Sequence, residues 1–310
     1  MGSGRWSHHV YDAAREFRAA QGLGAFAYSD HCMSATPRRQ WRAHPSLDPY
    51  GIGLRESRDS AEHPGSLAIA VLFDVTGSMR RVPQVLQAKL PGLFGLLRRK
   101  EYVRHPQLLF GAVGDATCDR VPLQLGQFES DNRMDANLGD ILLEGGGGGQ
   151  ATESYELAMY AMARHTSLDC WEKRRRKGYL FLIGDEMPYG RVKAREVREV
   201  LGGQLAEDIP TAAMVAELRR TYEVFYLLPA GSSYYGSRAV LQTWRGLLGQ
   251  NVIELDDLSA VCETIALTVG LSEEAIDLHA GLADLADIGS DAAPVVGRAL
   301  APFDHRRREG

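Results

Sequence analysis

Three runs of apolar residues that each stop at an aspartate constrain the fold of this 310-residue chain more than any other feature. Continuous apolar runs of this length are typical of parallel β-strands that are covered on both faces. In open parallel sheets, ligands gather at the carboxyl ends of the strands. We therefore expect the three aspartates to lie at one edge of a sheet. The runs and their aspartates are residues 67–73 with Asp74, residues 108–113 with Asp115, and residues 179–183 with Asp185.

Segments with the apolar spacing of helices alternate with these strand-like runs. Residues 121–128 instead alternate apolar with polar residues, and they follow residues 108–113 too closely for a helical crossover, which predicts an antiparallel edge strand. The predicted fold is therefore α/β, a doubly wound and mostly parallel sheet with one antiparallel edge strand. Pro91 is expected to kink or split the first helix. The predicted helices are residues 79–97, 134–143, 153–165, 211–221, 237–248 and 258–269, and the further strands are residues 222–228 and 252–255.

The alternation of strands and helices predicts a main domain over residues 67–270. Residues 1–66 are rich in Arg, His, Ser and Pro, and they contain one candidate short helix, residues 11–21. We interpret them as an extension of mostly irregular backbone that packs on the main domain. Residues 271–310 are weakly periodic, which predicts a helical tail with one helix and a loop.

The composition excludes several classes of partner. Lys and Arg number 35 and Asp and Glu number 40, so a net charge of −5 gives no basic field that would attract nucleic acid or an anionic membrane. No apolar run approaches the ~20 residues of a membrane span, and the first residues lack the apolar core of a signal peptide. The four cysteines are far apart and form no CxxC pair. These observations predict a cytoplasmic protein with reduced thiols.

The first of the three aspartates begins a short polar turn, Asp74-Val75-Thr76-Gly77-Ser78. A carboxylate and two hydroxyls at alternate positions of a strand-to-helix turn form the all-oxygen ligand set that a hard divalent cation requires. Asp74 alone could equally well cap the following helix. The other strand-end carboxylates favour a metal site. A nucleotide P-loop is not indicated, because no Gly-Lys-Ser/Thr follows the glycines of residues 145–149.

The turn resembles the DxSxS signature of von Willebrand factor A (vWA) domains, whose metal-ion-dependent adhesion site (MIDAS) holds Mg²⁺. Family members add an aspartate from a later strand end, here Asp185, and a hydroxyl from an intermediate loop, here within residues 145–154. The resemblance implies that Thr76 and Ser78 ligate Mg²⁺ directly, with Mn²⁺ or Ca²⁺ as alternatives. It implies that Asp74 and Asp185 act largely through water. An acidic residue of a protein partner would complete the coordination.

The intermediate loop departs from the family pattern, which usually has a threonine. Thr152 keeps the residue type, whereas Glu153 keeps the spacing to the following Ala158-Met159. Both residues are therefore candidate ligands. A glutamate would add a third carboxylate and weaken the attraction for a partner's acid. Glu153 is also interpretable as an acid in the first turn of a helix, where the helix dipole favours it.

The resemblance implies a bacterial, intracellular adaptor or scaffold that binds a protein in a Mg²⁺-dependent manner and is not an enzyme. Many bacterial proteins of this type work beside MoxR-like AAA+ ATPases, which makes such an ATPase the implied partner. The alternative is a phosphatase of the haloacid-dehalogenase type with Asp74 as nucleophile. Those enzymes need a second aspartate where this chain has Thr76, and Gly184-Asp185-Glu186 matches only half of their later motif. A third interpretation is a structural domain with a vestigial site.

Overall fold

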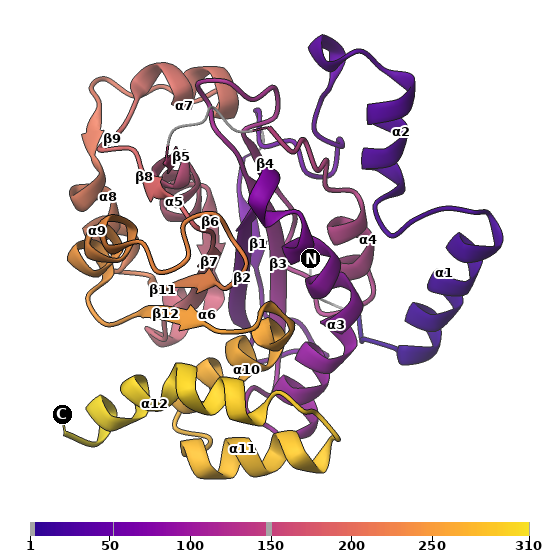
Figure 1. Cartoon of the computed structure of the whole chain (residues 1–310), viewed down its shortest axis with the longest axis vertical. Coiled ribbons are helices and arrows are strands. Elements are labelled where there is room, and N and C mark those ends of the chain that lie inside the picture. Colours follow the sequence, from indigo (N-terminus) through magenta and orange to yellow (C-terminus); the bar gives the residue numbers. More distant parts are fainter. Residues whose placement is uncertain (1–3, 52, 147–150, 310) are drawn as a thin grey trace.

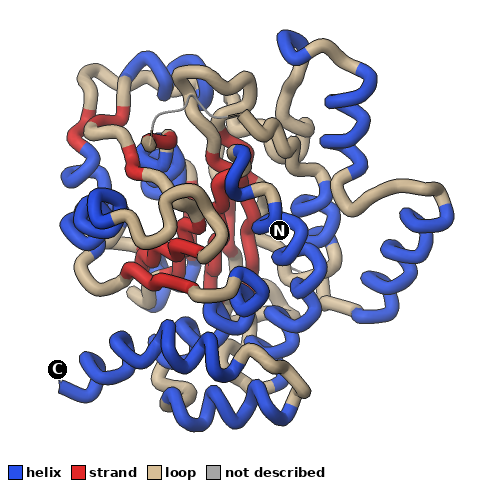
Figure 2. The backbone as a smooth tube through the Cα atoms, in the orientation of Figure 1, coloured by secondary structure: helices blue, strands red, loops and turns tan. Residues whose placement is uncertain are grey.

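The computed structural model describes residues 4–51, 53–146 and 151–309, without the side chains of Ser78, Arg99 and residues 305–309. Its centre is a sheet with the strand order β12-β11-β7-β2-β3-β4 (Figures 1 and 2). All neighbours are parallel except β3 and β4, which are antiparallel. The predicted fold class is thereby confirmed. The strands are β2 (Leu67–Asp74), β3 (Pro106–Val113), β4 (Leu123–Leu125), β7 (Gly178–Ile183), β11 (Tyr222–Pro229) and β12 (Val252–Leu255).

The register of the sheet brings the predicted strand ends together. Strand β2 pairs with β3 up to Asp74↔Val113 and with β7 up to Phe73↔Ile183. From β2 the chain continues outward to β3 and β4, whereas from β7 it continues the other way to β11 and β12. The order of the strands therefore reverses between β2 and β7. Such a reversal is the position at which open α/β sheets bind ligands.

Helices cover the sheet in two groups (Figure 1). Helices α3, α4 and α10 pack together, and α5, α8 and α9 form the other group. Residues 261–271 of α10 are all buried, because α11 and α12 cover the side of α10 that faces away from α3. These helices are α3 (Arg81–Arg99), α4 (Arg133–Gly139), α5 (Tyr155–Arg164), α8 (Thr211–Leu218), α9 (Arg238–Leu248), α10 (Val261–Ser272), α11 (Leu278–Asp287) and α12 (Ala293–Glu309).

The tail contains two helices where we expected one helix and a loop. Asp277 caps α11 by accepting a hydrogen bond from the Ala280 N–H at 2.8 Å. None of the helices that the structure describes has the length and apolar character needed to cross a membrane.

Helix α3 runs through Pro91, so the predicted split does not occur. Proline has no N–H, and the carbonyl of Gln87, four residues earlier, therefore lacks its helical donor. The hydroxyl of Tyr11 replaces that donor, with a buried hydrogen bond of 2.9 Å to the Gln87 carbonyl oxygen. Tyr11 belongs to α1 (His8–Ala20), which corresponds to the helix predicted at residues 11–21.

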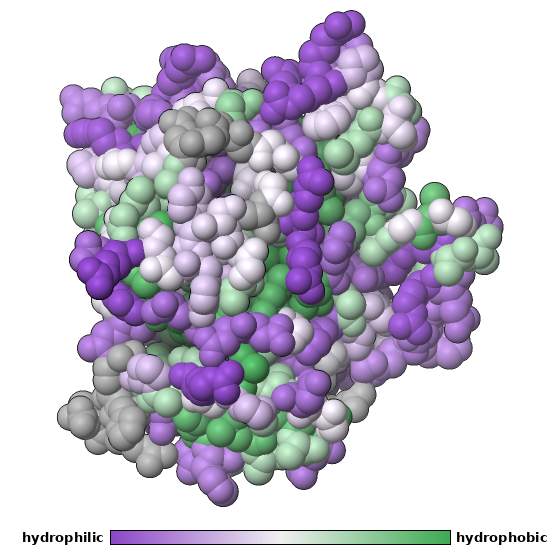
Figure 3. All heavy atoms as spheres, viewed as in Figure 1, coloured by the Kyte–Doolittle hydropathy of each residue, from purple (hydrophilic) through white to green (hydrophobic). Residues whose placement is uncertain are grey.

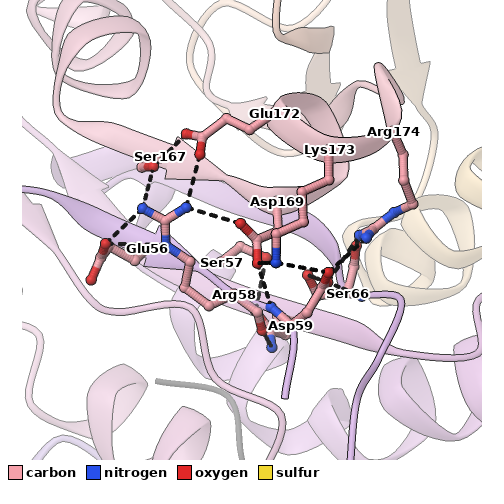
Figure 4. Close-up of polar contacts among 11 residues, drawn as sticks. Glu56, Ser57, Arg58, Asp59, Ser66, Ser167, Asp169, Glu172, Lys173 and Arg174 are labelled. Carbon is pink, nitrogen blue, oxygen red and sulfur yellow. Dashed lines mark hydrogen bonds and ion pairs between the residues drawn. The ribbon is translucent and has the colours of Figure 1, made fainter. Parts of the chain in front are cut away.

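The extension contains more regular structure than its composition predicts. Strand β1 pairs in parallel with β6, and Arg58, directly after β1, bonds to Ser167 in β6 and to Asp169 and Glu172 in α6 (Figure 4). Asp59 accepts hydrogen bonds from Arg174 and Lys173 of α6 (Figure 4). This network ties the extension to the main sheet. The elements of the extension are α2 (Ala27–Ala35), a 3₁₀ turn (Arg38–Gln40) and β1 (Arg55–Ser57). The elements β6 (Thr166–Leu168) and α6 (Asp169–Arg174) belong to the main domain.

Short elements surround the carboxyl end of the sheet, and two of them, at residues 152–153 and 258–260, stand where the sequence predicted the starts of helices. They are β5 (Thr152–Glu153), β8 (Met187–Pro188), β9 (Arg191–Val192), α7 (Ala194–Leu201), β10 (Ile209–Pro210), and 3₁₀ turns at Gly77–Met79 and Leu258–Ala260. The face of the molecule in Figure 3 is mostly polar, with apolar side chains in separate places. Several exposed large apolar side chains belong to the extension, namely Val10, Phe17, Leu23, Met33, Tyr50 and Leu54.

Candidate metal site

The turn after β2 holds the carboxylate of Asp74 in a fixed orientation. Asp74 is completely buried, and its Oδ1 accepts hydrogen bonds from the Thr76 N–H at 2.6 Å and the Thr76 hydroxyl at 2.5 Å. The hydroxyl of Tyr155 donates to the other oxygen, Oδ2, at 3.2 Å. Ser78 lies in the 3₁₀ turn that follows, but its side chain is outside the part of the chain that the structure describes. Its role as a ligand stays a prediction.

The intermediate loop is joined to the segment after Asp185 by a small parallel sheet. Strand β5 pairs with β8 in the register Thr152↔Met187 and Glu153↔Pro188. The Met187 N–H also donates to the Ala151 carbonyl at 3.0 Å. Residues 147–150 of the glycine run lie outside the described residues, but the Gly146 carbonyl accepts a hydrogen bond from the Gly77 N–H at 3.2 Å. The loop is thus connected to both the Asp74 turn and the Asp185 turn.

The structure places Glu153, rather than Thr152, against Asp74. Neighbouring residues of a strand point to opposite faces, so only one of the two can face the aspartate. Glu153 is 1% exposed, and its pKa is raised to about 11 by burial and then by repulsion from Asp74 and Glu186. Thr152 is half-buried and lies near the hydroxyl of Tyr189.

Asp185 lies beside Asp74 on the neighbouring strand end, as the register requires. It is completely buried, and its Oδ2 accepts a hydrogen bond from the Tyr234 N–H at 3.1 Å. The residue before it must be glycine, since a Cβ at Gly184 would collide with the hydroxyl of Tyr155. Tyr155 therefore fills the space between the ends of β2 and β7.

Several carboxyl groups are buried close together at the site. Burial raises the pKa of Asp74 to about 7, with a further contribution from Asp185, against hydrogen bonds from Thr76 and Tyr155 that lower it. Burial and repulsion from Asp74 and Asp185 raise the pKa of Glu186 to about 8. Among the described residues, the charged groups that act most strongly on Asp74, Glu153 and Glu186 are other carboxylates. Two carboxyl oxygens of the site, Oε2 of Glu153 and Oε2 of Glu186, are buried and have no hydrogen-bond partner among the described residues.

These residues fit a hard divalent cation. A cation would pair with the unsatisfied oxygens and offset the repulsion, and carboxylates and hydroxyls are the ligands that Mg²⁺ and Ca²⁺ take. Within the described ranges, however, no three His, Cys, Asp or Glu side chains converge as a ready ligand group. The fit is therefore to an ion held partly by hydroxyls and by water-bridged carboxylates.

A second polar cluster lies at the end of β3. The Oδ1 of Asp115 accepts hydrogen bonds from the Thr117 N–H at 2.8 Å and the Thr117 hydroxyl at 2.7 Å. The Tyr189 hydroxyl donates to the same carboxylate, 3.1 Å from Oδ1 and 3.0 Å from Oδ2. The hydroxyl of Ser154 accepts from the Ala116 N–H at 2.9 Å, which joins this strand end to the intermediate loop.

Three side chains of the site were not identified as site residues from the sequence. Glu186 directly follows a predicted site aspartate, and that position was the available signal. Tyr155 and Tyr189 reach the site across the fold, and no local pattern marks them.

Comparison with family models and with curated proteins finds no match. Among solved structures, the pilus adhesin SpaC from Lactobacillus rhamnosus GG in its open conformation matches with 9% identity and a TM-score of 0.47, over 71% of this chain and 31% of the adhesin. Proximal thread matrix protein 1 from the mussel byssus matches with 9% identity and a TM-score of 0.43, over 67% of this chain and 46% of that protein. The chain thus spans less than half the length of either structure. Similarities this low carry no argument about function.

Proposed function

We propose that this chain is a vWA-type domain that binds Mg²⁺ between the ends of β2 and β7 and uses the ion to bind another protein. The observation that supports this proposal is the meeting of the Asp74 turn, the intermediate loop and Asp185 at the reversal of strand order. Buried carboxylate oxygens without partners lie at that meeting point. Folding alone does not require several carboxyl groups to be buried together, because burial of each charged group is costly.

Each residue of the site has a distinct part in this proposal. Thr76 and Ser78 would hold the ion with their hydroxyls, while Asp74 and Asp185 would act largely through water. Tyr155 and the Tyr234 N–H orient the two aspartates through the hydrogen bonds described above. When bound, Mg²⁺ would supply an electrophilic centre for an acidic group of the partner. Mn²⁺ and Ca²⁺ are alternative ions.

The biological setting of the proposal follows the resemblance alone. It is a cytoplasmic adaptor or scaffold that works with a MoxR-like AAA+ ATPase. The phosphatase alternative gains no support from the site, because the residue two positions after Asp74 is a threonine whose hydroxyl donates to that aspartate. A general acid would be needed there.

Calorimetric titration with Mg²⁺ tests the proposal directly. We expect binding by the wild type, with micromolar to millimolar affinity, and none by Asp74→Ala. Affinity purification of the tagged wild type in Mg²⁺ and in EDTA, with Asp74→Ala as control, then tests partner binding. Equal Mg²⁺ binding by both proteins would refute the site. If the same proteins were captured in Mg²⁺ and in EDTA, and by the wild type and Asp74→Ala, Mg²⁺-dependent recognition would be refuted.

A further inference from the structure

The site contains more carboxylates than a cation that recruits an acidic partner needs. The resemblance implies two aspartates, the spacing of the intermediate loop adds Glu153 as a candidate, and the structure places Glu186 beside them. Glu153 lies close enough to Asp74 and Glu186 to be repelled by both carboxylates. If all four groups are ionised, they outweigh the two positive charges of Mg²⁺. An additional acid from a partner would then meet net repulsion.

Backbone pairing fixes Glu153 in this position. Its strand, β5, is held on one side by β8, in the register that sets Glu153 beside Pro188. On the other side, the next residue, Ser154, accepts a hydrogen bond from the Ala116 N–H and donates its own N–H to the Gly114 carbonyl at 3.4 Å.

The interpretation of Glu153 as a dipole-favoured acid does not account for its surroundings. Such an acid is usually exposed or accepts hydrogen bonds from the free N–H groups of the helix. Glu153 is 1% exposed, and its Oε2 has no hydrogen-bond partner among the described residues. A buried carboxylate oxygen without a donor is costly, so the group either keeps a proton or pairs with a cation.

We infer that Glu153 is a carboxylate ligand supplied by this chain itself, which offsets the charge of the bound cation and excludes acidic ligands until Glu153 is displaced. The inference rests on the proposed cation site and adds that Glu153 regulates which ligands reach the ion. Glu153 thereby determines what the site accepts. A site with threonine in this position would be open to an acidic partner, whereas this one is held closed.

Acetate is a suitable probe of whether Glu153 keeps carboxylate ligands away from the ion, with Mn²⁺ in place of Mg²⁺. Water-proton relaxation of the Mn²⁺-bound protein reports the water that remains on the ion, and a carboxylate that binds the ion displaces this water. The wild type is compared with Glu153→Gln, which removes the charge and keeps the shape. The matched control is Glu263→Gln, which also alters a buried glutamate with an unpartnered Oε2, on α10 in the other group of helices.

We expect acetate to bind the Mn²⁺-loaded Glu153→Gln protein about tenfold more tightly than the wild type, because one repelling charge is gone. Glu263→Gln should behave as the wild type does. Equal acetate affinity in the wild type and Glu153→Gln, with Mn²⁺ bound to both, would overturn this inference and leave the proposed function intact. Absence of Mn²⁺ binding by the wild type would remove the proposed function and the inference with it.

The folding of the variants is checked by thermal unfolding in EDTA. Glu153→Gln should be about as stable as the wild type there, because the raised pKa keeps Glu153 protonated without a cation and the neutral amide replaces a neutral group. Glu153→Thr, which introduces the residue type of the family's loop, provides a second test of the same acetate prediction. Wild-type acetate affinity in a folded Glu153→Thr protein would also overturn the inference.

Discussion

The chain contains two Asp-x-Thr turns at the ends of neighbouring strands, and they are locally alike. In Asp74-Val75-Thr76 and in Asp115-Ala116-Thr117, one oxygen of the aspartate accepts both the N–H and the hydroxyl of the threonine. Their surroundings differ. Each aspartate also accepts a hydrogen bond from a tyrosine hydroxyl, from Tyr155 at Asp74 and from Tyr189 at Asp115, but Asp74 in addition faces the carboxylate of Asp185.

The difference shows that the turn itself is a structural motif, which orders the chain as it leaves a strand. The turn becomes a candidate metal site only where the ends of neighbouring strands place further carboxylates beside it. Asp74 lies next to the reversal of strand order and meets Asp185 there, whereas Asp115 lies one strand farther out. A sequence match to the turn alone therefore cannot separate a cation site from a well-satisfied loop.

The largest expected effect is on cation binding. Asp74→Ala should abolish the stabilisation of the folded protein by Mg²⁺, which in the wild type amounts to about 2.7 kcal/mol at a hundredfold excess over the dissociation constant. Asp115→Ala should keep most of it, since that carboxylate lies one strand away from the reversal of strand order where Asp74 and Asp185 meet. Thermal unfolding with and without Mg²⁺ measures both. If Asp115→Ala lost the stabilisation equally, the two turns would have to be regarded as one site.

The second effect concerns stability without a cation. The pKa of Asp74 is raised from 3.8 to about 7, so the folded state keeps a proton that the unfolded state loses above about pH 4. In EDTA the free energy of unfolding should therefore fall between about pH 4 and pH 7, by an amount on the order of a few kcal/mol. Mg²⁺ should offset this loss.

The matched substitutions should have opposite signs at about pH 8 in EDTA. Asp74→Asn should raise the unfolding midpoint, because removing a buried charge that faces Asp185 outweighs the loss of the hydrogen bond from Tyr155. Asp115→Asn should lower it, because the amide nitrogen cannot accept the hydrogen bond of Tyr189, at a cost of about 1–3 kcal/mol. Denaturant unfolding of the two variants is the measurement, and destabilisation by both would contradict the contrast between the turns.

The threonines offer a finer comparison. Thr76→Ala and Thr117→Ala each remove one hydrogen bond to a carboxylate, which should cost about 1.5–3 kcal/mol of stability. Only Thr76→Ala should also weaken Mg²⁺ binding, because Thr76 is the proposed ligand. Calorimetric titration of the two folded variants distinguishes them. Equal Mg²⁺ affinities would exclude Thr76 from the coordination.

The smallest expected effect is on phosphate esters. Neither the wild type nor Asp74→Asn should hydrolyse an aryl phosphate above background in Mg²⁺, because Thr76 cannot serve as a general acid. A colorimetric assay checks this. Turnover by the wild type that Asp74→Asn removes would favour the phosphatase alternative and assign the first turn a catalytic role.

The sequence predicted the features of this fold that depend on long apolar runs. Strands β2, β3 and β7 are buried throughout, and their composition shows it. The side-chain direction of Glu153 was not predictable, because a two-residue pairing between β5 and β8 determines it and so short a strand has no periodicity. The contacts of Tyr155 and Tyr189 depend on tertiary packing in the same way. In the extension, α2 and β1 were missed because neither has an apolar pattern.

The hydrogen bond between Tyr11 and the carbonyl that Pro91 leaves free makes the extension and α3 thermodynamically interdependent. A helix with an internal proline contains a built-in acceptor, and here a hydroxyl 76 residues away in sequence satisfies it. Because α3 begins just after the turn that carries Asp74, we expect a loss of α1 to weaken the helix that follows this turn. Proteolytic removal of the first twenty or so residues would then loosen the strand-end turn without touching any of its side chains.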